Sequence, residues 1–270
     1  MKARALLGQA CVLLTAVVWV GPYVWMLLTS LKTLPELLRE PLAPFPKTVN
    51  FAAYREVWRT VPMGRYLMNT TIMASLIASL QIALALPAGF ALAKLHFVGK
   101  RAAFGWVMVC LLVPAQATFV PVFLLLGGAG WVNTMAGLVV PFGASALGTF
   151  LVRQALLSVP DEIIEAARLD GASDLYVVYR MLAPLLRPTL TALFLLSFVF
   201  HWNDYFWPLV MTTDDHVRTV PLAIALLREQ GTGVRWHLVM AGNVILSGPV
   251  LVVFALTQKH LVRAVAAKRL

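Results

Sequence analysis

Six long apolar segments run through this chain and leave only short polar stretches between them. A helix needs about 20 mostly apolar residues to cross the hydrocarbon core of a bilayer, which is ~30 Å thick. Because 60% of the residues are hydrophobic and only 13% are charged, a soluble globular protein is excluded. The sequence therefore predicts an all-α integral membrane protein with six transmembrane helices. These cover approximately residues 6–31, 66–93, 102–126, 134–157, 188–210 and 237–261.

The first apolar segment follows Lys2 and Arg4 and continues to about Leu31. A secretory signal has an apolar core of only about 7–15 residues, so this longer segment predicts a transmembrane helix and not a cleaved peptide. A long polar loop follows up to Arg65. Within it, residues 50–59 predict a short helix lying in the membrane interface, with a loop packed against the membrane as the alternative.

The distribution of basic residues predicts the orientation in the membrane. Short cytoplasmic loops are richer in lysine and arginine than short external loops. The turn from Lys94 to Arg101 is basic, as are both ends of the chain, whereas the turn from Gly127 to Asn133 carries no charge. We therefore expect a multi-pass protein with its N- and C-termini in the cytoplasm. The net charge of +10 is scattered beside the apolar segments, which favours membrane lipid and argues against nucleic acid as a partner.

The polar interval of residues 158–188 is the longest between two apolar segments in the second half of the chain, and it predicts two short helices. Ser158 is placed to cap the first helix. Gly171 is expected to end that helix, because glycine adopts the left-handed conformation without a steric penalty. Ser173 is then expected to cap the second helix, and Pro184 to end it. The predicted orientation places this interval in the cytoplasm.

The spacing in this interval resembles the EAA loop of membrane subunits in ATP-driven, binding-protein-dependent (ABC) importers. Glu165-Ala166-Ala167 is followed by Gly171, six residues after the glutamate, and by Pro184, thirteen residues after the glycine. The family usually has isoleucine and leucine where this chain has Met181 and Ala183, so apolar residues replace apolar ones. An ordinary amphipathic connector is the alternative. The resemblance assigns contact with a separate ATPase subunit to Glu165, Ala166, Ala167, Asp170, Gly171 and Pro184.

Further patterns extend the resemblance over nearly the whole chain, from about residue 20 onward. The run Trp202-Asn203-Asp204-Tyr205-Phe206-Trp207-Pro208 is similar to the carbohydrate branch of these importers, especially to the second membrane subunits of maltose, multiple-sugar and glycerol-3-phosphate importers. The resemblance implies a type I ABC importer permease fold with a cytoplasmic coupling helix. It also implies two parts. Residues 1–65 hold the first transmembrane helix and a long periplasmic loop, and residues 66–270 hold a five-helix permease core. The tail after Arg263 departs from the family pattern.

Polar side chains near the end of the fifth apolar segment are candidates for the substrate pathway. Ionisable groups at membrane depth are costly and usually face a bundle interior or a wet cavity. Aromatic rings beside asparagine and aspartate also suit a sugar, whereas a belt of aromatic residues at the membrane interface is the alternative. The candidates are Ser197, His201, Asn203 and Asp204, with Gln81, Gln116, Asn243 and Ser247 as weaker members of the set.

Catalytic motifs are missing from the sequence. It contains no G-x-x-x-x-G-K-[ST], H-E-x-x-H or G-x-S-x-G pattern. Cys11 and Cys110 both lie within apolar segments and suggest neither a disulfide nor a metal site. We therefore expect no enzymatic activity, no metal and no cofactor in this chain. The resemblance places ATP and Mg in separate partner subunits.

Together, these expectations predict that the chain is a permease subunit of an ATP-driven importer in the bacterial cytoplasmic (inner) membrane. The resemblance implies a heterodimer with a second homologous permease subunit, two ATP-binding subunits, and a soluble binding protein that delivers the solute. A sugar is the expected solute, because no arginine or lysine is well placed within a span to bind a phosphate. Glycerol-3-phosphate or a related phosphodiester is the alternative. A secondary transporter is disfavoured, because the spans contain few charges and the two halves show no repeat.

Overall fold

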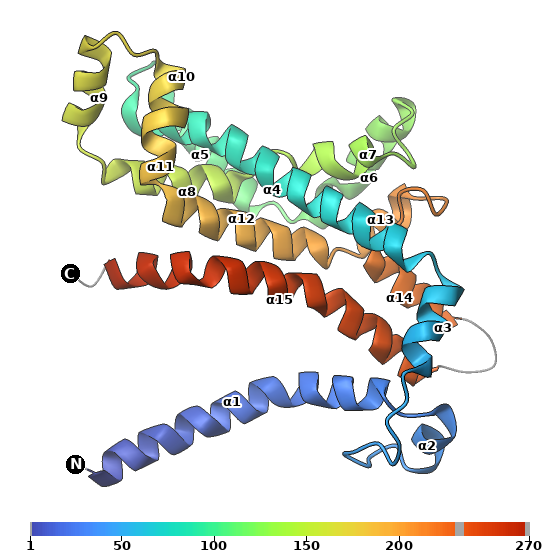
Figure 1. Cartoon of the computed structure of the whole chain (residues 1–270). Coiled ribbons are helices and arrows are strands. Elements are labelled where there is room, and N and C mark those ends of the chain that lie inside the picture. The colour runs from blue at the N-terminus through green and yellow to red at the C-terminus, as the bar shows by residue number, and fades with distance from the viewer. Residues whose placement is uncertain (1, 230–234, 268–270) are drawn as a thin grey trace. The chain divides into compact units, whose positions relative to one another are not determined.

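The structure is a computed structural model that describes residues 2–229 and 235–267. Within these residues it contains helices and no strand, which confirms the predicted all-α fold (Figure 1). The chain divides into two compact units. The first comprises Met1–Leu67 and Val220–Pro249, and the second comprises Met68–Thr219 and Val250–Leu270. Lys268 and Arg269, which make the C-terminal end of the sequence basic, lie outside the described residues.

Three helices are long and apolar enough to span a membrane unaided. They are α1 (Lys2–Ser30), α4 (Met63–Lys94) and α15 (Trp236–Ala267). Three pairs of helices, each bent at a short break, are together also long and apolar enough to form one span per pair. The pairs are α5 (Lys100–Leu112) with α6 (Ala115–Gly128), α7 (Met135–Val139) and η1 (Val140–Phe142) with α8 (Ala146–Leu157), and residues Asp174–Leu185 with α12 (Arg187–Trp202). Counting each pair once gives six spans by length and composition, the number that the sequence predicts.

Proline explains the sharpest of these bends, the 98° break between α5 and α6. Pro114 precedes the first residue of α6 with an extended backbone, at φ −67° and ψ 137°. Its ring cannot donate a helical hydrogen bond, so α5 ends before it and α6 starts after it. The two prolines of this apolar segment predict interruptions at Pro114 and at Pro121. The first is confirmed, whereas the second is wrong, because Pro121 lies within α6 without breaking it.

The first unit is built around buried apolar side chains from short helices. Val57 of α3 (Ala52–Thr60) and Leu227 of α14 (Val220–Glu229) are both fully buried in this cluster. Glu56 of α3 also forms an ion pair with Arg235, just before α15. The helix predicted at residues 50–59 is confirmed. The same unit holds α2 (Leu34–Arg39), which Thr33 caps by accepting from the N–H of Glu36.

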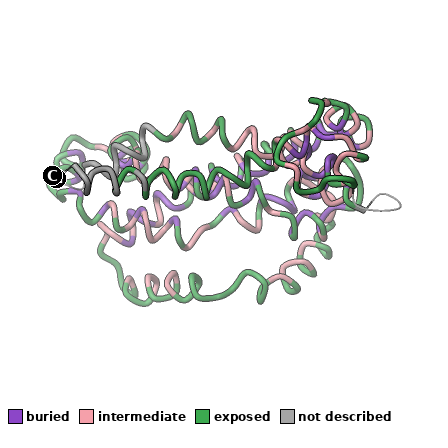
Figure 2. The backbone as a smooth tube through the Cα atoms, turned by 90° about the horizontal axis from the view of Figure 1, so that it is seen from below, coloured by how far each residue is buried: buried purple, intermediate pink, exposed green. Residues whose placement is uncertain are grey.

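The largest apolar cluster of the second unit joins α4, α8, α12 and the 158–188 interval. Leu86 of α4 and Val152 of α8 lie within it. Between them the helices approach closely, because a Cβ atom added at Gly89 would lie 2.7 Å from Cγ1 of Val152 and 3.0 Å from the backbone nitrogen of Arg153. Small residues allow such contacts between membrane helices. Figure 2 shows buried positions interspersed with exposed ones along some helices, whereas other helices are exposed or half-buried over most of their length.

The fifth predicted span is not continuous, which corrects the expectation of one helix over residues 188–210. α12 ends at Trp202, and α13 (Phe206–Met211) starts after a short break. Asp204 explains the new start, because its Oδ1 accepts from the backbone N–H of Trp207 at 3.3 Å. Aspartate competes in this way with continued helical bonding. The break turns the end of α12 into a wall of the cavity described below.

Candidate functional site

The 158–188 interval, here called the coupling segment, forms α9 (Asp161–Leu169), α10 (Asp174–Tyr176), the π-helix η2 (Val177–Leu182) and α11 (Ala183–Leu185). The predicted cap at Ser158 is wrong. Its Oγ donates to the carbonyl of Ala155 at 2.8 Å and so belongs to the end of α8. Pro160 occupies the cap position of α9 and makes no side-chain cap bond. Acidic Asp161 and Glu162 fill the first turn of α9, where the helix dipole favours negative charge.

The turn between α9 and α10 has the predicted conformation. Gly171 has φ +83°, in the left-handed region, and its N–H donates to the carbonyl of Arg168 at 3.0 Å. Ser173 then caps α10, as predicted, by accepting from the N–H of Tyr176 at 3.3 Å. An ion pair between Arg168 and Asp174, at 2.8 Å, closes the turn.

The second helix of the coupling segment passes through Pro184, so the predicted stop at this proline is wrong. The π-helix η2 precedes the proline, and the N–H of Ala183 donates to the carbonyl of Val178, five residues earlier. Proline lacks an N–H donor, and its ring clashes with the preceding turn of an α-helix. The wider turn of a π-helix accommodates both. The helix therefore continues to Leu185 before the chain bends into α12.

The coupling segment buries one face and exposes the other. Ile164 and Ala167 are buried against the cluster of α4 and α8. Leu169 is 90% exposed, and Leu175 and Tyr176 are also exposed. Five of the six residues that the sequence singled out are exposed: Glu165, Ala166, Asp170, Gly171 and Pro184. The sixth, Ala167, belongs to the buried face. An exposed apolar surface rimmed by charge is typical of a docking site for another protein. Figure 1 shows α9 and α10 at one end of this unit, with α6, α7 and α13 toward the other.

A lysine at the end of α4 holds the start of the coupling segment. Lys94 Nζ donates to the carbonyl of Val159 at 2.5 Å and to Oδ1 of Asp161 at 2.6 Å. The side chain of Lys94 is only 8% exposed, whereas that of Asp161 is 72% exposed. The hydrogen bond from Lys94, followed by its charge, lowers the pKa of Asp161 below the ordinary value of 3.8. The chemistry of this contact is structural: it fixes α9 to α4.

This contact predicts how the anchoring of α9 depends on pH. A carboxyl group with a depressed pKa stabilises the folded state above its unfolded pKa, and that stabilisation is lost as the pH falls through the folded pKa. We therefore expect amide hydrogen exchange at residues 165–169, whose N–H groups can bond within α9, to stay constant from about pH 5 to pH 8 and to rise below about pH 4, after correction for its intrinsic pH dependence. Asp161→Asn should raise the exchange already at pH 7. Lys94→Met should also raise the exchange at pH 7, although it keeps the carboxylate at the start of α9. If the exchange rises in Asp161→Asn and not in Lys94→Met, the effect comes from the helix dipole and not from the ion pair.

A cavity of about 660 Å³ lies in the second unit, between α6, η1, α12 and α13. Aromatic rings make up much of its wall, with Trp207 edge to face against two of them and Phe119 tilted against Phe206. The rings of Phe119 and Phe206 lie 4.8 Å apart, and Trp207 meets Phe119 at 5.7 Å and Phe142 at 5.5 Å. Trp207 is fixed by a hydrogen bond from Nε1 to the carbonyl of Gly137 at 3.1 Å. The result is a rigid aromatic pocket of a size usual for small-molecule sites.

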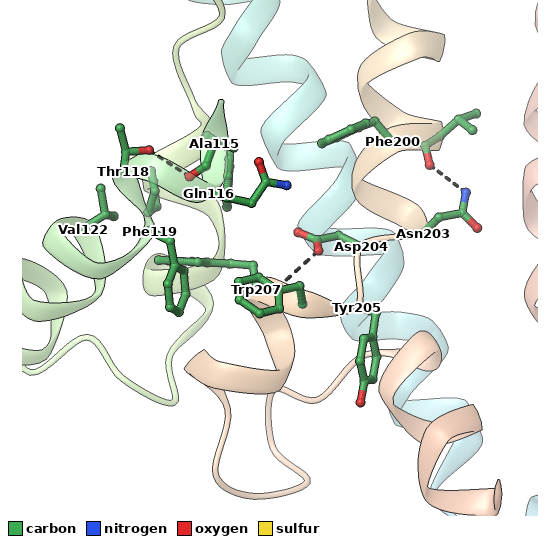
Figure 3. Close-up of a pocket in the computed structure, with 14 residues that line it drawn as sticks. Ala115, Gln116, Thr118, Phe119, Val122, Phe200, Asn203, Asp204, Tyr205 and Trp207 are labelled. Atoms are coloured by element: carbon green, nitrogen blue, oxygen red, sulfur yellow. Dashed lines mark hydrogen bonds between the residues drawn. The ribbon is translucent and has the colours of Figure 1, made fainter. Parts of the chain in front are cut away.

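A few polar groups enter this pocket. Figure 3 shows the side chains of Gln116 and Asp204 extending into the same space from opposite walls. Asn203 instead folds back on α12 and donates to the carbonyl of Val199 at 2.8 Å. Among the described lining residues, Asp204 is the acidic one, and none is lysine, arginine or histidine. The arrangement can stack against flat apolar faces and bond to hydroxyl or amine groups.

The pathway residues predicted from sequence occupy different places. Asn203 and Asp204 line the cavity, as does the weaker candidate Gln116. Gln81 is buried beside it, where Nε2 donates to the carbonyl of Phe142 at 2.9 Å and lies 3.5 Å from Nε2 of His201. Ser197 is buried on the same helix as His201. The remaining candidates lie in the first unit, where Asn243 donates to its own helix at Val239 and Ser247 donates to Asn243.

Sequence reasoning missed the opposite wall of the cavity. Phe119 and Phe142 stand in apolar segments, where an aromatic residue looks the same whether it faces lipid, a core or a cavity. The available signal was Gln116, an amide between Pro114 and Pro121, because a polar side chain beside a helix break is unusual in a span.

The comparisons with known proteins agree on one family. Residues 85–267 match the model of the binding-protein-dependent transport system inner membrane component. The chain is 31% identical over 235 residues, 84% of either protein, to the sn-glycerol-3-phosphate transport system permease protein UgpE of Pectobacterium atrosepticum. It is 29% identical to the protein of that name from Rhizobium meliloti, over 96% of this chain and 94% of the relative. Among solved structures, a bacterial ABC transporter involved in the import of the acidic polysaccharide alginate shares the fold, with a TM-score of 0.83 and 20% identity over 96% of both chains.

Proposed function

This chain belongs to the family of binding-protein-dependent transport system inner membrane components, and from this premise we propose a function. The chain carries a sugar across the bacterial inner membrane as one permease subunit of an ABC importer. The cavity between α6, α12 and α13 is the observation that supports a sugar. Its rings offer flat apolar faces, while Gln116 and Asp204 offer partners for hydroxyl groups. We assign the translocation pathway to this cavity.

The proposed assembly has four kinds of subunit. This chain pairs with a second homologous permease, two ATP-binding subunits lie on the cytoplasmic side, and a soluble binding protein delivers the solute from outside. Both termini of this chain face the cytoplasm. ATP and Mg bind the ATPase subunits, and the coupling segment docks into them through Glu165, Ala166, Asp170, Gly171 and Pro184. The contact expected of Ala167 is not proposed, because this residue is buried within the chain. Exposure of Leu169 and Tyr176 beside these residues supports a docking role.

Glycerol-3-phosphate is the second candidate solute, because the two relatives described above are named as permeases for it. Anionic phosphate groups are usually bound by arginine or lysine. The cavity instead presents the carboxylate of Asp204 and, among its described lining residues, no basic side chain. This charge favours a solute without negative charge, so the sugar remains the leading proposal.

The first experiment is a gentle-detergent purification of the tagged chain from its native membranes, with quantification of the proteins that accompany it. We expect a second permease of similar size and two copies of a P-loop ATPase per complex. ATP hydrolysis by this complex should then be stimulated by binding protein loaded with sugar, and not by binding protein offered glycerol-3-phosphate. A chain that purifies alone or as a homodimer, and that moves solute in vesicles without ATP, would overturn the proposal.

A substitution in the cavity tests the pathway assignment. In proteoliposomes containing the complex, Asp204→Asn should raise the solute concentration for half-maximal uptake by about tenfold, because a hydrogen bond to a charged group contributes about 1.5–3 kcal/mol. Glu40→Gln is the matched control, since Glu40 pairs with Lys47 in an exposed loop of the other unit. Equal uptake by Asp204→Asn and the parent complex would remove Asp204 from the pathway.

A further inference from the structure

Pro87 leaves a backbone acceptor unpaired inside α4. In an uninterrupted α-helix, the N–H of residue 87 would donate to the carbonyl of Ala83, four residues earlier. Proline has no N–H, so the Ala83 carbonyl loses that partner, and the helix becomes easier to bend at this point. α4 nevertheless continues on both sides of Pro87, from Met63 to Lys94.

The coupling segment supplies the missing donor. The hydroxyl of Tyr179 donates to the carbonyl of Ala83 at 2.8 Å, although the two residues are 96 positions apart in the chain. Tyr179 lies on the π-helix η2. Tyr179 itself is 42% exposed, but Val178 and Leu182 of the same π-helix are buried in one cluster with Leu86 of α4, so the helix that carries the hydroxyl is packed against α4.

The coupling segment thus touches α4 on both sides of Pro87. Tyr179 bonds to Ala83 before the proline, and Lys94 bonds to Val159 and Asp161 after it. A movement of the coupling segment must therefore move α4 or break these bonds.

The same part of α4 also holds the cavity wall. Gln81 lies two residues before Ala83, about 3 Å along the helix axis. Its Nε2 donates to the carbonyl of Phe142, a cavity-lining residue, at 2.9 Å. From the Tyr179 hydroxyl to the wall of the cavity there are thus two hydrogen bonds and half a helical turn.

We propose that Tyr179 is the positioning residue through which the coupling segment acts on the cavity. Its hydroxyl, bound at the carbonyl that Pro87 frees, transmits the displacement of the segment to residues 81–83 of α4 and thereby to Phe142. This inference rests on the proposed function, because it presupposes that ATPase subunits displace the segment. Tyr179 touches neither solute nor nucleotide; it acts through α4.

A double-mutant cycle tests the physical premise in the purified complex. Tyr179→Phe removes the hydroxyl alone and should lower the thermal unfolding temperature by about 2 °C. In a Pro87→Ala background the new backbone N–H pairs with the Ala83 carbonyl, so the same Tyr179→Phe substitution should have no effect there. Tyr23→Phe, on exposed α1, is the control. Equal shifts in both backgrounds would overturn the role of the freed carbonyl.

The transmission itself is tested by a cysteine reporter, because the solute need not be known. In a background with Cys11 and Cys110 replaced by serine, Asn203→Cys places a thiol in the cavity wall, and its labelling by a maleimide is timed with and without ATP and vanadate. The parent should show a nucleotide-dependent rate that Tyr179→Phe reduces at least about fivefold while ATP hydrolysis continues. A full nucleotide response in Tyr179→Phe would overturn the inference alone. A parent complex without ATPase subunits, or without any nucleotide response, would overturn the proposed function as well.

Discussion

Gly171→Asp is expected to leave the chain inserted in the membrane and assembled, while lowering solute-dependent ATP hydrolysis by tenfold or more. The backbone at Gly171 has φ +83°, and an L-residue in this conformation costs roughly 1–2 kcal/mol. No heavy atom lies within 4 Å of a Cβ added here, so the substitution meets no steric clash. The strain is instead relieved by rotation of the backbone, which changes the angle between α9 and α10 and misplaces Leu169 and Leu175.

Gly99→Asp is the matched control for this prediction. Gly99 has φ +84°, also with open space around it, but it caps α5 and lies outside the coupling segment. Both variants are compared in proteoliposomes for insertion, for ATP hydrolysis and for uptake. If Gly171→Asp transports as well as the parent, or if Gly99→Asp loses as much coupling, the assignment of coupling to the α9–α10 turn is wrong.

Gly89→Ala should lower the stability of the chain, because α4 and α8 approach closely at this residue. The added methyl group would lie within 3.0 Å of the backbone nitrogen of Arg153, which cannot rotate away. Overpacking of this kind costs about 1–3 kcal/mol, equivalent to a fall in unfolding temperature of about 3–8 °C.

A substitution at a second glycine provides a control in which the unfolding temperature should rise. Gly105 lies within α5 with no atom within 4 Å of an added Cβ. Alanine is preferred to glycine in a helix by up to about 1 kcal/mol, so Gly105→Ala should raise the unfolding temperature by about 2 °C. Thermal unfolding in detergent, followed by tryptophan fluorescence, measures both. Destabilisation by Gly105→Ala equal to that by Gly89→Ala would contradict the close approach at Gly89.

Features that depend on local backbone chemistry could be predicted from the sequence. Gly171 and Ser173 gave the turn and cap of the coupling segment, and Pro114 gave the break between α5 and α6, because each acts through its own backbone or its nearest neighbours. The cap predicted at Ser158 was wrong because of a similarly local alternative. A serine can bond forward as a cap or back to the preceding turn, and α8 already occupies the residues before it.

Features that depend on distant residues could not be predicted. Lys94 and Asp161 are 67 residues apart, and nothing in their local sequences distinguishes this pair from other charges near membrane ends. Pro184 was expected to stop a helix, but packing of η2 into the core stabilises a π-helical path around it. In the candidate site, Gln116, Asn203 and Asp204 could be found by their polarity alone. The aromatic residues Phe119 and Phe142 became evident only when α6 and η1 were placed opposite α12.

The exposure of α1 determines which amino-acid substitutions this helix tolerates. Within Cys11–Ser30, an 18-residue stretch buries none of its residues in the chain, whereas the corresponding stretch of α4 is 44% buried. Substitutions among apolar residues at Val12 to Val20 therefore meet no neighbour within the chain, and most should be neutral to its stability. In α4, Gly89, Gln81 and Ala85 each have a neighbour that would have to change with them. A saturation-mutagenesis library should consequently accept most apolar residues along the first helix and few along the fourth.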